Sequence, residues 1–246
     1  MKQWFKESLR EFPTVFSVLR TVYRFLFPSS EKLMAKQIMK TLGEKPSVFF
    51  VQVGAGDGVQ GDLIHSLIDN NEHWSGVFIE PVEFVYRRLK QNYKDSERFV
   101  FENIAIGIEK GIKQFYYVSE EAKAKLGDDL PYWYDQLGSF DRNHILKHLD
   151  GKLEPYIVEE EIDCVPLQEI LDKNNVKKID LLHIDTEGFD YRVLSQINFN
   201  KYKPSIVLYE HRHLRDDERE KANSLLKNSG YSLRIYAGDT LAILKG

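Results

Sequence analysis

Three glycines at alternate positions follow an apolar run and could hold a ligand against the backbone. The run V-F-F-V-Q-V covers residues 48–53, and Gly54, Gly56 and Gly58 come directly after it, with Asp57 before the last. A run that is apolar on both faces is typical of a central parallel strand. Glycine is favoured where a ligand approaches the backbone, because a Cβ would block it. A tight turn needs glycine for steric reasons too, so the pattern alone leaves both interpretations open.

The next two segments favour the ligand-binding interpretation. Residues 62–70 have apolar side chains at helical spacing, and a helix there would point its first amides at a ligand over the turn. Residues 76–79 predict a second strand, which ends at Glu80. An acidic residue at the tip of a neighbouring strand can accept hydrogen bonds from both hydroxyls of a ribose. The glycine turn and Glu80 together predict a site for a nucleoside-containing ligand.

Carboxylates and histidines follow two later predicted strands, 178–185 and 205–210. The polar residues at their ends are Asp185, Glu187, Glu210, His211 and His213. Open parallel sheets bind ligands at the carboxyl ends of their strands, so these side chains are candidates for chemistry. A hydroxyl is a poor nucleophile until a base removes its proton or a metal ion lowers its pKa. We expect Asp185, Glu210 and His211 to be catalytic.

The same three residues could hold a hard divalent cation, although no ligand motif requires one. Two alternatives also remain open for their neighbours. Glu187 could instead cap a helix that begins near Phe189, and the strand-end histidines could simply be solvated.

Residues 107–165 depart from the alternation of strands and helices. Strands are predicted at 114–118 and 157–165, and aromatic and hydrogen-bonding residues lie between them. Such an insertion can form a pocket for a hydroxylated acceptor. The candidate acceptor-binding residues, two of them from the strand ends, are Tyr134, Ser139, Phe140, Glu187 and His213. Ser139 could instead cap the helix predicted near residue 141.

The composition predicts one domain in a reducing compartment. The 246 residues are 42% hydrophobic, enough for one core. A net charge of −4 argues against general nucleic-acid binding, which needs a basic surface. A single cysteine, Cys164, excludes an internal disulfide and a thiolate zinc cluster. Without an apolar run long enough to span a membrane, and without a signal-peptide core, we expect a cytoplasmic protein.

Residues 1–27 carry aromatic residues at roughly helical spacing and an excess of cationic side chains. Pro13 is expected to divide them into two helices. This segment could pack on the sheet or on a second copy of the chain, or rest on an acidic bilayer surface as a peripheral contact. Ser30 is then expected to cap a helix over 31–42, which Gly43 ends.

The other segments continue the α/β pattern. Pro81 should start a helix over 82–93, and a strand over 98–106 carries Asn103 near its end. The remaining predicted elements are helices at 166–174 and 216–228 and an antiparallel hairpin of strands at 231–236 and 240–244.

Four segments of this order resemble the FkbM family of class I S-adenosylmethionine-dependent methyltransferases. They read V-Q-V-G-A-G-D-G at 51–58, V-F-I-E-P at 77–81, E-N-I-A-I-G at 102–107 and I-D-L-L-H-I-D-T-E-G-F-D at 179–190. The last is the most specific. The resemblance implies a doubly wound, mostly parallel sheet with a C-terminal antiparallel hairpin. We expect a helical extension over 1–45 and a methyltransferase domain over 46–246, with an insertion at about 111–165.

The resemblance also implies a cofactor, S-adenosylmethionine, and methylation of an oxygen atom on a sugar, glycan or secondary metabolite. The cofactor-binding residues it implies are Gly54, Ala55, Gly56, Asp57, Gly58, Glu80, Pro81, Asn103, Ile104, Ala105 and Asp185. His183 stands where the family commonly has lysine, and Thr186 where valine is frequent. We expect His183 to be a core residue bonded to a neighbouring carbonyl.

Two other functions compete with this one. An NAD-dependent oxidoreductase would have a similar fold, but its phosphate-binding loop has the third glycine one position later. A noncatalytic module could keep the nucleoside pocket and bind a partner through the aromatic N-terminus. The presence of both Glu80 and Asp185 argues against that loss of function.

Overall fold

The computed structural model describes residues 29–93 and 97–246. The helices and the membrane or subunit contact predicted for residues 1–27 therefore lie outside the described residues.

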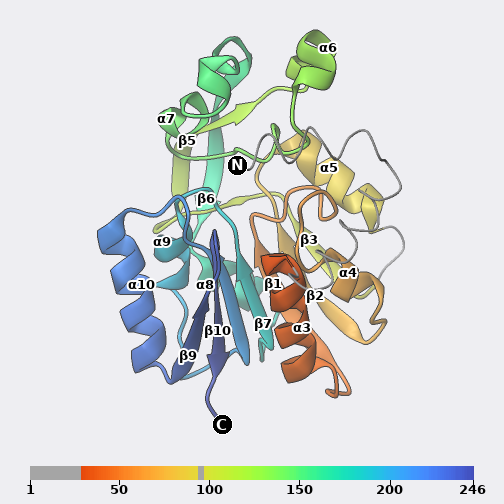
Figure 1. Cartoon of the computed structure of the whole chain (residues 1–246), viewed down its shortest axis with the longest axis vertical. Helices are drawn as coiled ribbons and strands as arrows, with labels where there is room; N and C mark the ends of the chain where they lie inside the picture. The colour runs from red at the N-terminus through yellow and green to blue at the C-terminus, as the bar shows by residue number, and fades with distance from the viewer. Residues whose placement is uncertain (1–28, 94–96) are drawn as a thin grey trace, which may run out of the picture.

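A seven-stranded sheet forms the centre of the molecule (Figure 1), in the order β3-β2-β1-β7-β8-β10-β9. Its strands are β1 (Val48–Val53), β2 (Trp74–Ile79), β3 (Phe99–Glu102), β7 (Leu181–Ile184), β8 (Ile206–Glu210), β9 (Tyr231–Ile235) and β10 (Asp239–Leu244). All neighbours are parallel except β10, which runs antiparallel to both β8 and β9. The predicted fold class and the C-terminal hairpin are confirmed. The strand order reverses between β1 and β7, where sheets of this type bind ligands.

Helices cover both faces of this sheet because successive strand residues point to opposite sides. One face packs on α3 (Ser30–Leu42), α4 (His65–Asp69) and α5 (Glu83–Asn92) through a cluster that includes Phe50 and Phe78. The other packs on α8 (Leu167–Lys173), α9 (Asp190–Leu194) and α10 (Asp216–Asn228) around Val51 and Tyr209. Although the expected domain boundary at residue 45 separates α3 from β1 in sequence, the two share one hydrophobic core.

Two helix starts differ from the expected ones. Ser29, not Ser30, is the N-cap of α3, and its hydroxyl accepts a hydrogen bond from the amide of Lys32. The helix expected from residue 62 begins at His65, because the Asp62 carboxylate accepts from the amide of Ile64 and holds a turn there. The first amides of α4 therefore do not follow directly from the glycine turn.

The strand predicted over 98–106 is two strands in two different sheets. β3 ends at Glu102, and the Asn103 side chain donates to the carbonyls of Glu80 and Pro81, both at 2.9 Å. The chain then enters a second sheet with the order β4-β6-β5. Its strands are β4 (Ala105–Ile106), β5 (Gly111–Val118) and β6 (Ile157–Val165).

The insertion between β4 and α8 lies over the carboxyl ends of the parallel strands, at the top of Figure 1. It contains α6 (Glu121–Leu126), α7 (Arg142–Leu146) and the short 3-10 helices η2 (Gly127–Asp129), η3 (Leu149–Gly151) and η4 (Glu154–Tyr156). A small hydrophobic cluster of its own, including Leu137 and Ile145, holds these elements together. The insertion therefore covers the carboxyl ends of the parallel strands.

Candidate active site

A pocket lies between the strand ends and the insertion. Its walls come from the glycine turn after β1, the segment after β2, residues 104–106, the end of β7 and the insertion. The predicted site residues that line it are Gly54, Ala55, Gly56, Glu80, Pro81, Ile104, Ala105, Phe140, Asp185 and Glu187. The structure thus brings together residues from five separate stretches of sequence.

The three glycines of the turn have different surroundings, although all have positive φ. A Cβ on Gly54 would lie 1.7 Å from the carbonyl oxygen of Asp185, so this glycine lets the ends of β1 and β7 touch. A Cβ on Gly58 would lie 2.5 Å from the Tyr93 ring. A Cβ on Gly56 would meet nothing closer than 3.9 Å, because this residue faces the pocket. Only Gly56 therefore keeps its backbone open to a ligand.

Asp57 and Gly58 are not among the lining residues. The Asp57 carboxylate accepts hydrogen bonds from the amides of Val59 and Gln60, at 2.9 and 2.8 Å, and so fixes the turn from behind. Asn103 is exposed and also lies outside the pocket, with its side chain used in the bend after β3. These three predicted cofactor residues shape the site without lining it.

Glu80 stands at the tip of β2, as expected, and lines the pocket. Its carboxylate accepts from the amides of Gly56 and Val82, both at 2.9 Å. Burial raises the pKa of Glu80 to about 7, although these two hydrogen bonds act in the opposite direction. Each oxygen can accept a further hydrogen bond, since a carboxylate offers about four lone-pair positions.

Apolar side chains form the wall beside Glu80. Ile104 and Ile106 from the segment after β3 line the pocket together with Phe115 and Phe140 of the insertion. The rings of Phe115 and Phe140 pack edge to face at 5.1 Å, and Phe140 also contacts Phe189 at 4.9 Å. A flat aromatic ligand can be buried against such a wall.

The rest of the pocket is strongly acidic. Seven carboxylates line it: Glu31, Asp62, Glu80, Asp135, Asp185, Glu187 and Asp239. Among the residues that the structure describes, neither lysine nor arginine lines it. Burial, followed by the negative charge of Glu187 and Asp190, raises the pKa of Asp185 well above its usual value. The field in the pocket therefore favours a positively charged ligand.

Buried polar atoms also point to a ligand on the α3 side of the sheet. Gln52 of β1 lies beside His183 of β7 in the strand register, and both line the pocket near Asp62. Gln52 Oε1, His183 Nδ1 and Asp62 Oδ2 are buried without a hydrogen-bond partner in the described part of the chain. His183 is therefore not bonded to a neighbouring carbonyl as expected. Burial lowers its pKa to about 4, so its imidazole is neutral.

The predicted catalytic residues separate into two groups. Asp185 lines the pocket, whereas His211 is 6% exposed and its Nδ1 lies 3.0 Å from the hydroxyl of Thr240, behind the site. Glu210 is partly buried and lies beside His213, with 3.7 Å between Oε1 and Nε2. Asp185 and Glu210 remain neighbours, since burial, followed by the charge of Asp185, raises the pKa of Glu210. His211 does not join them, because the turn after β8 directs His211 away and His213 toward Glu210.

The predicted acceptor-binding residues also differ in position. Phe140 and Glu187 line the pocket, but Tyr134 is buried in the core of the insertion. The Ser139 hydroxyl donates to the carbonyl of Glu187 at 3.3 Å, and Asp141, not Ser139, is the N-cap of α7. Tyr134 and Ser139 thus support the pocket from outside.

Asp190, rather than Glu187, stabilises the turn before α9. Its Oδ2 accepts from the hydroxyl of Thr186 at 3.1 Å and from the amides of Thr186 and Gly188, and so closes the turn before α9. Glu187 has a φ of 52°, an uncommon value for a residue other than glycine. Its side chain is free of this turn and points instead to histidines of the insertion and the β8 loop.

Several residues that line the pocket could not be predicted from any sequence motif. Gln52 and His183 lie inside apolar strands, and Glu31 and Asp239 are far from any motif. The alternation of β1 could have indicated that Gln52 faces the same side as Phe50, but not that this side opens into a pocket.

As for membrane contact, no described helix combines the length and the apolar character that crossing a bilayer requires.

Comparisons with known proteins found similar solved structures and one matching family. Similar solved structures include a precorrin-6y C5,15-methyltransferase from Geobacter metallireducens, with a TM-score of 0.45, 9% identity and coverage of 85% of both chains. Another is a ribosomal protein L11 methylase from Lactobacillus delbrueckii subsp. bulgaricus, with a TM-score of 0.41, 10% identity and coverage of 87% of this chain and 78% of the other. No curated protein matches the chain. A family model described as the methyltransferase FkbM domain matches residues 52–233, and the chain belongs to this family.

Proposed function

We propose that the protein transfers a methyl group from S-adenosylmethionine to a hydroxyl of a sugar, a glycan or a secondary metabolite. The observation that carries this proposal is the acidic pocket at the switch point of the sheet. Membership of a methyltransferase family implies this cofactor. The nature of the acceptor rests on the resemblance and on the chemistry of the residues around the pocket.

The charge of the pocket discriminates between the two candidate cofactors. S-adenosylmethionine carries a positive sulfonium and a positive ammonium group, and it supplies a methyl carbon bonded to that electron-poor sulfur. NAD carries two negative phosphates, and the pocket lining in the described chain offers them seven carboxyl groups and neither lysine nor arginine. The pocket therefore supports the sulfonium cofactor over the dinucleotide.

The polar groups of the pocket match the other parts of this cofactor. Glu80 is available to accept from ribose hydroxyls, and the wall of Ile104, Ile106 and Phe115 can bury an adenine ring. The unpartnered oxygens of Gln52 and Asp62 can accept hydrogen bonds from an ammonium group. Each buried polar atom left unpaired costs about 1–3 kcal/mol, so a ligand that pairs them binds more tightly.

Transfer to oxygen requires that the acceptor be positioned and its proton removed. Positioning alone can contribute roughly 7–11 kcal/mol to lowering the barrier. Asp185 and Glu187 both line the pocket, and the ionised form of a carboxyl group with a raised pKa is a stronger base than an ordinary carboxylate. We assign proton removal from the acceptor to Asp185, and acceptor binding to Glu187 and Phe140 at the insertion side.

A mass-spectrometric screen tests this function. The protein would be incubated with S-adenosylmethionine and panels of nucleotide sugars, free glycans, lipid-linked glycans and polyhydroxylated small molecules. We expect the gain of one methyl group on an oxygen of an acceptor in these panels. Exclusive methylation of nitrogen or carbon would contradict the proposal, and a requirement for lipid linkage would favour a membrane contact through residues 1–27.

A further inference from the structure

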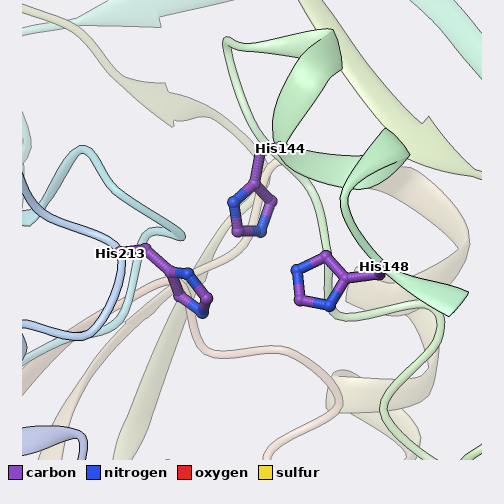
Figure 2. A group of neighbouring side chains, drawn as sticks. All are labelled: His144, His148 and His213. Atoms are coloured by element: carbon purple, nitrogen blue, oxygen red, sulfur yellow. The ribbon is translucent and has the colours of Figure 1, made fainter. Parts of the chain in front are cut away.

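Three histidines from two distant segments of the chain converge beside the pocket. His144 belongs to α7, His148 follows that helix, and His213 lies in the loop after β8. Figure 2 shows the three imidazole rings facing a common space, and their centroids are 4.7, 5.0 and 5.7 Å apart. One nitrogen of each ring lies within 4.8 Å of one nitrogen of each other ring.

Two carboxylates complete the group. Glu187 Oε2 lies 2.8 Å from His144 Nε2 and 3.5 Å from His213 Nε2. Glu210 Oε1 lies 3.7 Å from His213 Nε2, and oxygens of Glu187 and Glu210 fall within 4.8 Å of each other and of that nitrogen. Ligand atoms that share one ion at about 2.0–2.2 Å are roughly 3–4.4 Å apart. Small side-chain rotations would therefore bring these atoms to coordination distance.

The atoms that face this space are buried and incompletely hydrogen-bonded. His144 is 6% exposed, and its Nε2 lies 2.8 Å from Glu187 Oε2 without the geometry of a hydrogen bond, while neither atom has another hydrogen-bond partner among the described residues. Glu210 Oε2 also lacks a hydrogen-bond partner there. Buried polar atoms are nearly always paired in folded proteins, so several incompletely paired atoms around one space favour a ligand there. Imidazole nitrogens and carboxylate oxygens can all give an electron pair to a metal ion, so this set of atoms suits a cation.

We propose that His144, His148 and His213, with Glu187 as the carboxylate ligand, bind a divalent transition-metal ion. Three imidazoles favour Zn²⁺ or Co²⁺ over Mg²⁺ and Ca²⁺, which prefer oxygen ligands. This differs from the hard-ion site expected from the sequence, since His211 is absent from the cluster. Glu210 Oε1 lies 3.7 Å from His213 Nε2, at the edge of this group of ligands.

The position of this site gives it a role that rests on the proposed function. Glu187 belongs both to the cluster and to the lining of the cofactor pocket. An ion held there would lie at the acceptor side and lower the pKa of the acceptor hydroxyl. The hydroxyl proton would pass to Asp185, the oxygen would form its new bond to the methyl carbon, and the electron pair of the broken bond would remain on sulfur.

Metal binding by the purified full chain tests the site without any acceptor. The protein would be treated with EDTA, dialysed, and titrated with Zn²⁺ and Co²⁺, with Mg²⁺ as the comparison ion. We expect one equivalent of Zn²⁺ or Co²⁺ to bind, a visible Co²⁺ spectrum typical of nitrogen ligands, and a rise in melting temperature. His148→Ala and His213→Ala should each weaken binding by at least about 10-fold. His73→Ala, which removes an exposed histidine elsewhere, should leave binding unchanged.

The outcomes separate this site from the proposed function. The absence of stoichiometric Zn²⁺ or Co²⁺ binding would overturn the site, as would binding that both cluster variants retain in folded form. Circular dichroism would establish that these variants fold, and both residues are only partly buried. Metal binding without any binding of S-adenosylmethionine would instead contradict the proposed function and leave the metal site standing.

Discussion

The backbone of Gly54 touches the backbone of Asp185, since a Cβ at position 54 would lie 1.7 Å from the Asp185 carbonyl oxygen. The amide of Asp185 also donates to the carbonyl of Val53 at 2.9 Å. These contacts fasten the end of β7, with its carboxylate, to the start of the glycine turn. The position of Asp185 in the pocket therefore depends on the absence of a side chain at residue 54.

Gly54→Ala and Gly56→Ala should have different effects, although both glycines have positive φ. Alanine at position 54 would be strained by the positive φ, and its Cβ would also clash with the Asp185 carbonyl. We therefore expect a loss of roughly 2–5 kcal/mol of unfolding free energy. Alanine at 56 meets open space and should cost about 1–2 kcal/mol, but should obstruct the cofactor. Urea denaturation and calorimetric titration measure the two effects. Equal destabilisation, with cofactor affinity kept in Gly56→Ala, would be inconsistent with this geometry.

Cofactor affinity should rise with pH between about 6 and 8. The pKa of Glu80 is raised to about 7 in the free protein, and ribose hydroxyls bind better to the ionised carboxylate. Binding should therefore release a proton in this range, and the calorimetric enthalpy should depend on the buffer. Glu80→Gln should weaken binding and remove the pH dependence assigned to this group. A wild-type affinity that is constant from pH 6 to 8 would refute the role of Glu80.

The same raised pKa makes a separate prediction for the protein without ligand. Because burial favours the protonated form of Glu80 in the folded state, its contribution to stability should fall as pH rises from about 4.5 to about 7. The stability difference between Glu80→Gln and wild type should change in favour of the variant over this range. Denaturation at several pH values measures this stability difference. If it stays constant over the range, burial does not raise the pKa of Glu80.

Asp185→Asn should reduce turnover and increase stability at the same time. The side chain is isosteric, and it removes the free-energy cost of burying an ionisable carboxyl group beside Glu187 and Asp190. We expect a fall of about 10²–10⁴-fold in kcat, the usual contribution of a general base. The gain in unfolding free energy should be about 0.5–2 kcal/mol, which is the usual size of a single stabilising substitution. Unchanged methyl transfer at saturating substrate would show that Asp185 is not the base.

Asp180 should stabilise the fold at neutral pH and lose this effect in acid. Asp180 is 2% exposed. Its carboxylate accepts a hydrogen bond from the amide of Phe49 at 3.0 Å and forms ion pairs with Lys45 at 2.6 Å and Lys178 at 2.8 Å. Burial alone would raise the pKa of Asp180, but the hydrogen bonds from Lys178 and Lys45 outweigh it and hold the pKa below its usual value. A lowered pKa in the folded state gives stability that is complete above the unfolded pKa, about 3.9.

Asp180→Asn should therefore cost about 1–3 kcal/mol of unfolding free energy at pH 7. The cost should shrink below about pH 4, as the wild-type carboxylate becomes protonated. Urea denaturation across this range measures it, and Asp128→Asn, at an exposed residue, is the matched control. A cost that persists undiminished into acid would mean that the charge of Asp180 contributes nothing.

Much of the fold could be predicted because its signals are local. The run 48–53 is a strand with the expected bounds, and α10 covers the predicted residues 216–228. The break within 98–106 could not be predicted from its continuous apolar pattern. It depends on β6, which pairs with β4 through Cys164 and Val165, some sixty residues later in the chain.

The site was less predictable because it depends on the direction of side chains after the strands end. His211 and His213 look equivalent in sequence, but the amide of His211 donates to the carbonyl of Gly238, and this contact turns His211 behind the site. The spacing of His144 and His148 suits two ligands one helical turn apart, yet the third histidine is contributed by a loop that only the fold brings near. Motifs predicted the cofactor end of the pocket, whereas long-range packing determines its acceptor end.

Calorimetric titration of the wild-type protein with S-adenosylmethionine, its demethylated product and NAD tests the central claim most directly. The acidic pocket predicts that both sulfur-containing nucleosides bind, that the positively charged methyl donor benefits most from the carboxylates, and that NAD does not bind. Tight binding of NAD with no binding of either sulfur nucleoside would contradict the account.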